Sequence, residues 1–314
     1  MPHFSVVIPL FNKAASIEKC MQSVLNQDFD DFELLVINDG STDESLQKAR
    51  QFDDARIKII TQENAGVSAA RNKGVSLADA QWVAFLDADD YWDPHFLSEI
   101  KYLQDNFSEA DIFATAYSKV KNGRLTKVQN HETENFKGYF SFIRAYSSHW
   151  WMPLTSSSVV VSKEALKRGG GFPENIKMGE DFLLWVKLIL QNQLAFSNQA
   201  LSYYNQDSSL KERASMKKDY SPAEHFIFHL DFLKEKEQAD PSLKYLIDGL
   251  KVRALHHFYR NRRYRKQAVA MLKDINFSAH PKKYARYYTS PFWMMEMYLK
   301  WRNFGVALKR KIKR

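Results

Sequence analysis

The sequence predicts an α/β protein with a mainly parallel sheet flanked by helices, followed by a helical C-terminal extension. In the first half, short β-branched runs alternate with amphipathic segments, a rhythm typical of βαβ units. Strand-like runs stop after about residue 210. With 314 residues and 45% hydrophobic content, the chain is long enough to bury one large core or two.

The first half is expected to contain four strands joined by helices. The β-branched runs that predict the strands are residues 6–9, 33–38, 57–61 and 82–86. Amphipathic helices are expected at residues 16–25 and 42–52, with Ser16 and Ser41 as N-caps. Strands joined through helices pair in parallel, so we expect helices on both faces of one sheet.

The second half is expected to be less regular. Runs at 112–120 and 124–128 flank Asn122-Gly123, a pair that favours a hairpin turn. A further strand at 157–161 precedes a helix at 181–191. Prolines then mark expected helix boundaries, near Pro222, Pro241, Pro281 and Pro291. These changes of pattern divide the chain into residues 1–115, 116–210 and 211–314.

The positive charge is concentrated at the C-terminal end. The net charge is +8, and residues 251–314 hold 18 Lys and Arg against two acids, so the rest of the chain is acidic overall. A basic tail suits contact with anionic lipid or nucleic acid, or is simply a solvated helical end. The single Cys20 cannot form an internal disulfide, and no charged-then-apolar leader precedes residue 4, which favours a cytoplasmic location.

Polar side chains gather where the four predicted strands end. Ligands of open parallel sheets bind beyond the carboxyl ends of the strands, so these residues are expected to line one crevice. They include an aromatic ring able to stack on a base, carboxylates able to accept hydrogen bonds, and a dense acidic cluster. The segments concerned are Pro9-Leu10-Phe11-Asn12, Asn38-Asp39-Gly40, Asn64-Ala65-Gly66 and Asp87-Ala88-Asp89-Asp90.

The acidic cluster contains a strand-terminal DxD triplet, Asp87-Ala88-Asp89. Carboxylates there suit Mg²⁺ or Mn²⁺, which neutralise a departing diphosphate. Such triplets are also common in turns and caps. The apolar run 82–86 before it, and Asp39 at the end of a second strand, favour the metal-binding interpretation.

The N-terminal region resembles the nucleotide-binding half of family 2 glycosyltransferases, which have a Rossmann-like GT-A fold. Five segments match in order: 5–12, 22–27, 38–43, 63–72 and 85–90. Looser matches continue through residues 170–174 and 179–185. The resemblance implies that 1–115 is the nucleotide-sugar-binding half of a GT-A domain and 116–210 the acceptor-binding half. Residues 211–314 match no specific family and are expected to form a basic helical region.

The resemblance assigns roles to individual positions. It implies an inverting transfer from a nucleotide diphosphate donor, UDP by family habit, with Asp181 as general base and Asp89 as ligand of Mn²⁺ or Mg²⁺. Without the resemblance, Glu180-Asp181 would be an acidic pair favoured by a helix dipole. The positions expected to hold the nucleotide sugar are Pro9, Phe11, Asn12, Asp39, Asn64, Arg71, Asp87 and Ala88.

The acceptor is expected to lie near the aromatic segment at residues 149–153. Trp150 and Trp151 could stack on a sugar ring or be buried in the core. Glu180 and Trp185, in the segment around the base, are further candidate acceptor residues. One departure is that Tyr203-Tyr204 is followed by no histidine, so no phosphate or metal ligand is assigned there.

The tail from residue 291 combines helically spaced apolar residues with Lys and Arg. Such a helix suits an anionic membrane surface, which we expect it to contact through residues 288–314. The enzyme would then be peripheral on the inner face of the cell membrane, acting on a cell-surface glycan or a lipid-linked acceptor. The alternative is a helix docked on the catalytic domain or on a second subunit of a homodimer.

Two other functions are weighed against glycosyl transfer. A sugar nucleotidyltransferase usually shows a glycine-rich loop after the first strand, and Leu10-Phe11-Asn12-Lys13 has no glycine. A nucleic-acid-binding protein could use the basic tail, but the tail shows no helix-turn-helix, zinc or RRM signature. We therefore expect no nucleic-acid partner.

Overall fold

The computed structural model describes residues 1–130, 132–207, 220–290, 293–294 and 297. The chain forms two compact units, Met1–Lys234 and Glu235–Arg314, which are described separately. The tail segment for which membrane contact is predicted lies largely outside the described residues. Among the helices that are described, none combines the length and apolar character needed to span a bilayer.

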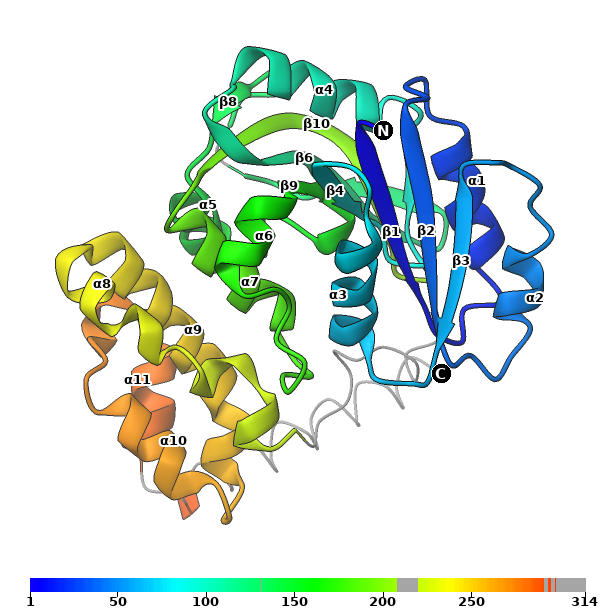
Figure 1. Cartoon of the computed structure of the whole chain (residues 1–314). Helices are drawn as coiled ribbons and strands as arrows, with labels where there is room; N and C mark the ends of the chain where they lie inside the picture. Colours follow the sequence, from blue (N-terminus) through cyan, green and yellow to red (C-terminus); the bar gives the residue numbers. More distant parts are fainter. Residues whose placement is uncertain (131, 208–219, 291–292, 295–296, 298–314) are drawn as a thin grey trace. The chain divides into compact units, whose positions relative to one another are not determined.

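One mixed sheet organises the first unit, and ten strands of the described chain take part in it (Figure 1). Its parallel part is formed by the first four strands in the order β3-β2-β1-β4. These are β1 (Phe4–Leu10), β2 (Phe32–Asp39), β3 (Ile57–Gln62) and β4 (Trp82–Phe85). All four predicted strands are therefore confirmed, and their carboxyl ends lie at one edge of the sheet.

Helices cover both faces of this sheet, as predicted. On one face, Val6 and Ile8 of β1 share a core with α1 (Ile17–Leu25) and α4 (Phe96–Asn106). On the other face, α3 (Val67–Leu77) packs so closely on β1 that a Cβ at Gly74 would lie 2.3 Å from Val7 Cγ1. This close approach requires glycine and fixes α3 directly over the strand.

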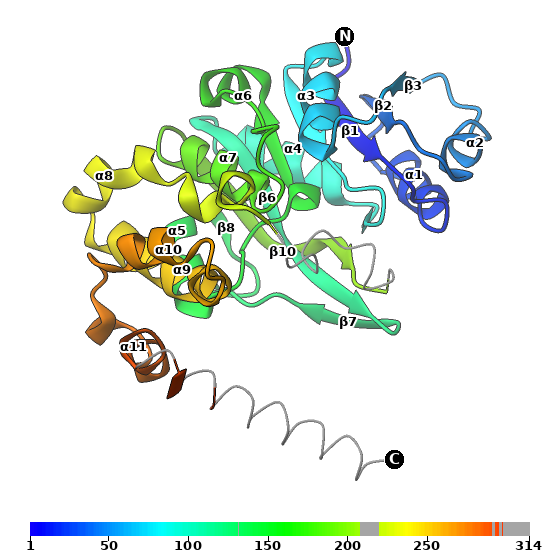
Figure 2. The same ribbon diagram turned by 90° about the horizontal axis from the view of Figure 1, so that it is seen from below.

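The second half of the sheet contains β9, which runs antiparallel to both of its neighbours, β4 and β6. The long strand β10 (Gln193–Asn205) pairs in parallel with β6 and in antiparallel fashion with β5 and β8. Asn122 and Gly123, both with positive φ, turn β6 into β7 as predicted, and Figure 2 shows this hairpin projecting beyond the sheet. The remaining strands are β5 (Tyr91–Trp92), β6 (Ala110–Lys121), β7 (Arg124–Lys127), β8 (Lys137–Tyr139) and β9 (Val159–Ser162).

Further short helices complete the first unit. They are α2 (Ser45–Ala49), α5 (Phe142–His149), η1 (Ser156–Ser158), α6 (Lys163–Gly169), α7 (Glu180–Ile189), η3 (Pro222–Glu224), η4 (Phe226–Phe228) and η5 (Asp231–Leu233). Ser16 occupies the N-cap of α1 as predicted, although its side chain makes no capping hydrogen bond. The prediction for Ser41 was wrong, because Glu44 occupies the N-cap of α2 while the Ser41 hydroxyl accepts from the Asn12 N–H.

The second unit is helical in its described part. It contains α9 (Pro241–Arg260), α10 (Arg265–Leu272), η6 (Phe277–Ala279) and α11 (Lys282–Thr289), and α8 (Lys234–Ala239) leads into it. Pro241 is the first residue of α9, where Asp240 accepts from the N–H groups of Ser242 and Leu243. The predicted boundaries at Pro222, Pro241 and Pro281 are confirmed, whereas Pro291 lies outside the described residues.

Candidate active site

The loops after β1 and β2 interlock through Asn12. Asn12 adopts a left-handed conformation (φ 51°), which asparagine tolerates better than most residues. Its Oδ1 accepts from the Thr42 N–H at 2.8 Å, and its own N–H donates to Ser41 Oγ at 3.2 Å. Pro9 lies within β1, and the neighbouring Phe11 side chain is 44% exposed. This loop therefore presents an aromatic ring to solvent at the strand ends.

Asp39 anchors the loop that follows β3. Its carboxylate accepts from Gln62 Nε2 at 2.8 Å, from the Ala65 N–H at 2.9 Å and from the Gly66 N–H at 2.8 Å. Its backbone carbonyl accepts from Asn64 Nδ2 at 2.9 Å. Two of the predicted site residues, Asp39 and Asn64, are thus brought into direct contact, and Asp39 is buried.

The acidic turn after β4 is tied to the second half of the domain by Ser157. The Ser157 hydroxyl donates to Asp90 Oδ2 at 2.6 Å and accepts from the Asp87 N–H at 3.1 Å. Asp90 Oδ1 accepts from the Asn205 N–H at 2.9 Å. Burial and the nearby charges of Asp89 and Asp87 raise the pKa of Asp90. Asp90 therefore anchors the turn to Ser157 and Asn205, while Asp87 and Asp89 remain partly exposed.

Asp89 is paired with a lysine that the sequence did not single out. Lys13 Nζ lies 2.7 Å from Asp89 Oδ2, and the two side chains are 21% and 22% exposed. Lys13 follows Asn12 in the loop after β1, so two strand ends meet at this contact. No local pattern in the sequence distinguishes Lys13 from a solvated surface lysine.

Arg71 of α3 joins the acidic turn to Glu180, the residue before the candidate base Asp181. Its guanidinium donates to Asp87 Oδ1 at 2.6 Å and to Glu180 Oε1 at 3.3 Å, and its side chain is 4% exposed. The ring of Phe172 lies beneath it, with 5.0 Å between the guanidinium carbon and the ring centroid. A buried cation is thereby matched with two carboxylates, which a low-dielectric position requires.

Glu180 and Asp181 open helix α7 at the edge of this ion-pair network. Gly179, with φ 78°, precedes them and forms the N-cap. Burial, together with the charge of Asp181, raises the pKa of Glu180 to about 7. Burial also raises the pKa of Asp181, against the opposing effect of Arg71. Carboxyls with raised pKa values beside a buried cation are suited to proton transfer near neutral pH.

The three candidate acceptor tryptophans lie in different environments. Trp150 ends helix α5 with a left-handed backbone (φ 52°), and Trp151 is 42% exposed. Trp185 is 1% exposed and packs against Phe85 and Phe172. The expectation for Trp185 therefore needs correction, because its indole is part of the core and has no face open to a sugar.

A divalent cation fits this site only with help from a ligand. Among the residues that the structure describes, no three His, Cys, Asp or Glu side chains converge as a ready-made metal site. Asp89 nevertheless already holds one cation, the Lys13 ammonium. A shell completed by diphosphate oxygens and water is usual for Mg²⁺, which rarely binds in an all-protein cage. The donor set is thus compatible with the predicted metal.

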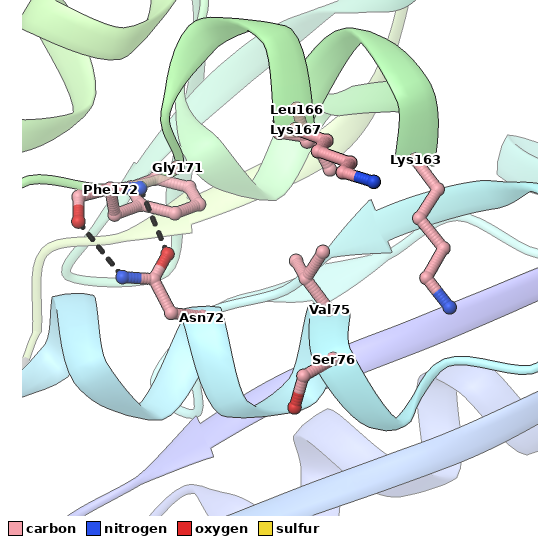
Figure 3. Close-up of a pocket in the computed structure, with 8 residues that line it drawn as sticks. All are labelled: Asn72, Val75, Ser76, Lys163, Leu166, Lys167, Gly171 and Phe172. Carbon is pink, nitrogen blue, oxygen red and sulfur yellow. Dashed lines mark hydrogen bonds between the residues drawn. The ribbon is translucent and has the colours of Figure 1, made fainter.

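A separate pocket of about 260 Å³ lies between α3 and α6 (Figure 3). Asn72 spans its end, exchanging hydrogen bonds with the N–H and carbonyl of Phe172, both at 2.9 Å. The pocket contains none of the predicted site residues; its lining is Asn72, Val75, Ser76, Lys163, Leu166, Lys167, Gly171 and Phe172. Phe172, which lines this pocket, also packs against the Arg71 guanidinium.

The chain has a GT-A type fold, which it shares with a solved structure. Residues 1–349 of S. aureus TarS, solved in complex with UDP-GlcNAc, match with a TM-score of 0.70 over 90% of this chain and 83% of that one, at 22% sequence identity. The model of "Glycosyl transferase family 2" matches residues 5–170, which is more than half of the chain. The chain therefore belongs to glycosyl transferase family 2, as the sequence predicted.

Relatives of similar sequence are also named glycosyltransferases. An uncharacterized glycosyltransferase of Rickettsia bellii is 32% identical over 63% of this chain and 28% of its own length. Glycosyltransferase GlyA of Streptococcus pneumoniae is 37% identical over 64% of this chain and 30% of its own length. The chain thus spans about a third of these relatives. The predicted enzyme class, glycosyltransferase, is the class of this family, and the nucleotidyltransferase alternative is set aside.

Proposed function

We propose that this protein transfers a sugar from a nucleoside diphosphate donor, a UDP-sugar, to a hydroxyl of a cell-surface glycan or lipid-linked acceptor, with inversion at the anomeric carbon. The observation that carries the proposal is the chain of contacts from Asp87, through Arg71, to Glu180, which directly precedes Asp181 at the start of α7. These contacts connect Asp87, which is proposed to lie near the nucleotide, with the region of Asp181, which is proposed to accept the proton. The UDP-GlcNAc bound to the TarS neighbour supports UDP as the nucleotide.

In this mechanism, Asp181 accepts the proton of the acceptor hydroxyl as that oxygen forms its bond to the anomeric carbon. The bond from that carbon to the diphosphate oxygen breaks on the opposite side, and the nucleoside diphosphate leaves. General-base assistance of this kind contributes about 10²–10⁴-fold. Arg71 holds Asp87 and Glu180 at fixed positions and, as a buried cation, favours negative charge developing nearby.

Donor binding is proposed for the strand-end residues. Phe11 offers its exposed ring to the base, and Asn12, Asp39 and Asn64 shape the loops around it. Pro9 in β1 and Ala88 in the turn after β4 contribute backbone at the same edge. When bound at Asp89, Mn²⁺ or Mg²⁺ would neutralise the diphosphate leaving group. Lys13, whose ammonium pairs with Asp89, would then be displaced from that carboxylate and could contact the same phosphates.

The proposal is tested by donor hydrolysis. Purified protein is incubated with UDP-, GDP-, CMP- and dTDP-sugars in Mn²⁺ or in EDTA, and nucleotide release is measured. We expect release from a UDP-sugar only with the metal. In Asp89→Ala, calorimetric titration should show nucleotide affinity that no longer depends on Mn²⁺, whereas Asp105→Ala, on the exposed side of α4, should behave as wild type. A metal dependence unchanged in Asp89→Ala would place the cation elsewhere.

A second part of the proposal concerns where the enzyme works. The basic tail would hold it on the inner face of the cell membrane, where a lipid-linked acceptor is presented to the strand-end site. The high density of Lys and Arg in residues 251–314 supports this location. Docking of the tail in a homodimer is the competing arrangement.

A further inference from the structure

The β6–β7 hairpin carries positive charge on one face. Side chains alternate along a strand, and directly opposed residues share a face, so Tyr117, Lys119 and Lys121 of β6 lie on the same side as Arg124, which pairs with Lys121. Lys127 pairs with Ser118 and lies on the other side. Residues 118–130 contain no Asp or Glu. We call Lys119, Lys121 and Arg124 the basic face.

Among the described residues, no carboxylate side chain forms an ion pair that compensates the charge of the basic face. Lys121 and Arg124 are exposed and lie directly opposite each other, and such like-charge pairs are destabilising. Within the described part of the chain, none of the three cations forms an ion pair with a carboxylate. The carboxylate of Asp207 at the hairpin tip accepts from the Asn122 backbone N–H instead. An external anion would relieve this repulsion.

Trp151 forms a fixed aromatic surface beside Lys119. The Lys119 ammonium lies 3.1 Å from the centroid of the indole, an arrangement with cation–π attraction. The indole N–H donates to the Tyr117 hydroxyl at 2.6 Å, and that hydroxyl donates to the Met152 carbonyl at 2.8 Å. The ring is therefore held in place while 42% of Trp151 remains exposed. Partial burial lowers the pKa of Lys119, consistent with an ammonium that lacks an anionic partner.

Short contacts connect this surface with both parts of the candidate active site. Lys119 pairs across the sheet with Tyr204, and the next residue, Asn205, donates its N–H to Asp90 in the acidic turn. On the other side, Tyr146 of the helix preceding Trp151 contacts the ring of Phe182, 5.8 Å between centroids. Phe182 follows Asp181 in the chain. The surface thus adjoins the region where the acceptor hydroxyl must meet its base.

We propose that Trp151 and the basic face form an acceptor subsite for a glycan that carries anionic groups, either phosphate or carboxylate. A sugar ring packs against the exposed part of the indole, Lys119 binds the first anion, and Lys121 and Arg124 bind the next along the chain. This inference rests on the proposed glycosyl transfer and adds the chemical class of its acceptor.

The test compares charged probes with their neutral counterparts. Trigalacturonate is the carboxylate probe, and its methyl ester is the neutral counterpart. Maltotriose phosphate is the phosphate probe, and maltotriose is its neutral counterpart. Binding is measured by calorimetry at low and high salt in the presence of UDP and Mn²⁺. We expect at least one charged probe to bind more tightly than its neutral counterpart, and more weakly as salt rises. Lys119→Gln should weaken that binding about 10-fold, as expected for loss of a charge-assisted hydrogen bond.

The hairpin supplies its own control. Lys127→Gln removes the same charge from the opposite side of the same strand pair and should leave probe binding unchanged. Trp151→Ala should weaken charged and neutral probes together, since stacking does not depend on charge. UDP binding in each variant verifies that the fold and the donor site are intact.

Three results would overturn the inference. The first is equal affinity of the wild type for charged and neutral probes, and the second is an equal loss of probe affinity in Lys119→Gln and Lys127→Gln. The third is Lys119-dependent binding of phosphatidylglycerol vesicles without binding of any oligosaccharide, which would make the hairpin a lipid contact. Failure of the proposed function looks different. In that case UDP does not bind and no UDP-sugar is hydrolysed, whichever acceptor probe is used.

Discussion

Lys13 Nζ lies 2.7 Å from Asp89 Oδ2, so the carboxylate that is proposed to hold the metal forms an ion pair with a lysine. We expect Lys13→Met to raise the Mn²⁺ affinity of the nucleotide-free protein. A partly exposed ion pair is worth at most about 1 kcal/mol, which limits the gain to about 5-fold. Calorimetric titration of Mn²⁺ measures it. Lys19→Met, which removes a nearby lysine packed over Tyr91, serves as control, and an equal gain in both variants would refute a specific role for Lys13.

Asp181→Asn should lower turnover by at least about 10²-fold, because the amide cannot accept the proton of the acceptor hydroxyl. The side chain accepts only the adjacent Phe182 N–H among the hydrogen bonds of the described residues, and the asparagine carbonyl oxygen can replace that contact. Nucleotide affinity and thermal stability should therefore stay near wild type. Single-turnover transfer and UDP titration separate the two effects. Near-normal turnover would remove Asp181 from the mechanism.

On the acidic limb of the pH–rate profile, transfer should decline at a higher pH than the one at which an ordinary aspartate is protonated. The pKa of Glu180 is raised to about 7, so the pair gains a proton as the pH falls through this value. The raised pKa of Asp181 has the same consequence: its carboxylate is lost at a higher pH than that of an ordinary aspartate. Transfer should decline as the pH falls, since only ionised Asp181 accepts a proton.

Glu180→Gln tests this assignment. It removes a negative charge beside Asp181, which makes ionisation of Asp181 easier, so the acidic limb should move to lower pH. Rates are compared at saturating donor, because the variant also loses an ion pair to Arg71. A limb that stays in place would mean that another group controls the profile.

Gly179→Ala should destabilise the protein and impair the site. An added Cβ would lie 2.4 Å from Phe226 Cδ1, in a backbone conformation with positive φ. Positive φ costs about 1–2 kcal/mol and overpacking about 1–3 kcal/mol, so we expect a loss of about 2–5 kcal/mol. Gly170→Ala is a matched control, since φ is also positive but nothing lies within 4 Å of the added Cβ. Urea denaturation compares the two, and equal losses would contradict the steric argument.

Removal of residues 291–314 should release the protein from anionic membranes. This cut retains Tyr288, which is buried and donates its hydroxyl to the Val252 carbonyl at 3.0 Å, so helix α11 keeps its packing. About 1 kcal/mol per basic residue near the surface is lost with the tail. Co-sedimentation with phosphatidylglycerol vesicles measures this, and phosphatidylcholine vesicles control for charge. Equal binding of full-length and shortened protein would favour a docked tail.

The sequence predicted the fold of residues 1–115 better than the rest, for a physical reason. Strands β1 to β4 are short runs that end in polar loops, and each is bounded by its own local signal. Strand β10 was missed because Ser197, Asn198 and Gln199 interrupt its apolar pattern, although both Ser197 and Asn198 are buried by neighbouring strands. Helix 42–52 was predicted too long, since only residues 45–49 form an α-helix.

The candidate site was likewise predicted only in part from the sequence. Motifs identified the residues near strand ends, but their pairing depends on the whole sheet. Lys13 and Asp89 are 76 residues apart, and Arg71 and Glu180 are 109 residues apart. Trp185 illustrates the opposite error, because the position within a helical turn decides whether an indole lies in the core or at a surface. The division at residues 115 and 210 remains a prediction, while the structure separates two compact units at residues 234 and 235.

The bonds made by Ser157 bear on how the domain folds and fluctuates. Its hydroxyl bonds Asp87 and Asp90, and its carbonyl accepts from Trp92 Nε1 at 2.6 Å and Ser202 Oγ at 2.8 Å. The acidic turn therefore cannot open without disrupting β10 as well. Segments coupled in this way exchange their amide hydrogens as one cooperative unit. We therefore expect the amides of the acidic turn to exchange slowly, together with those of β10.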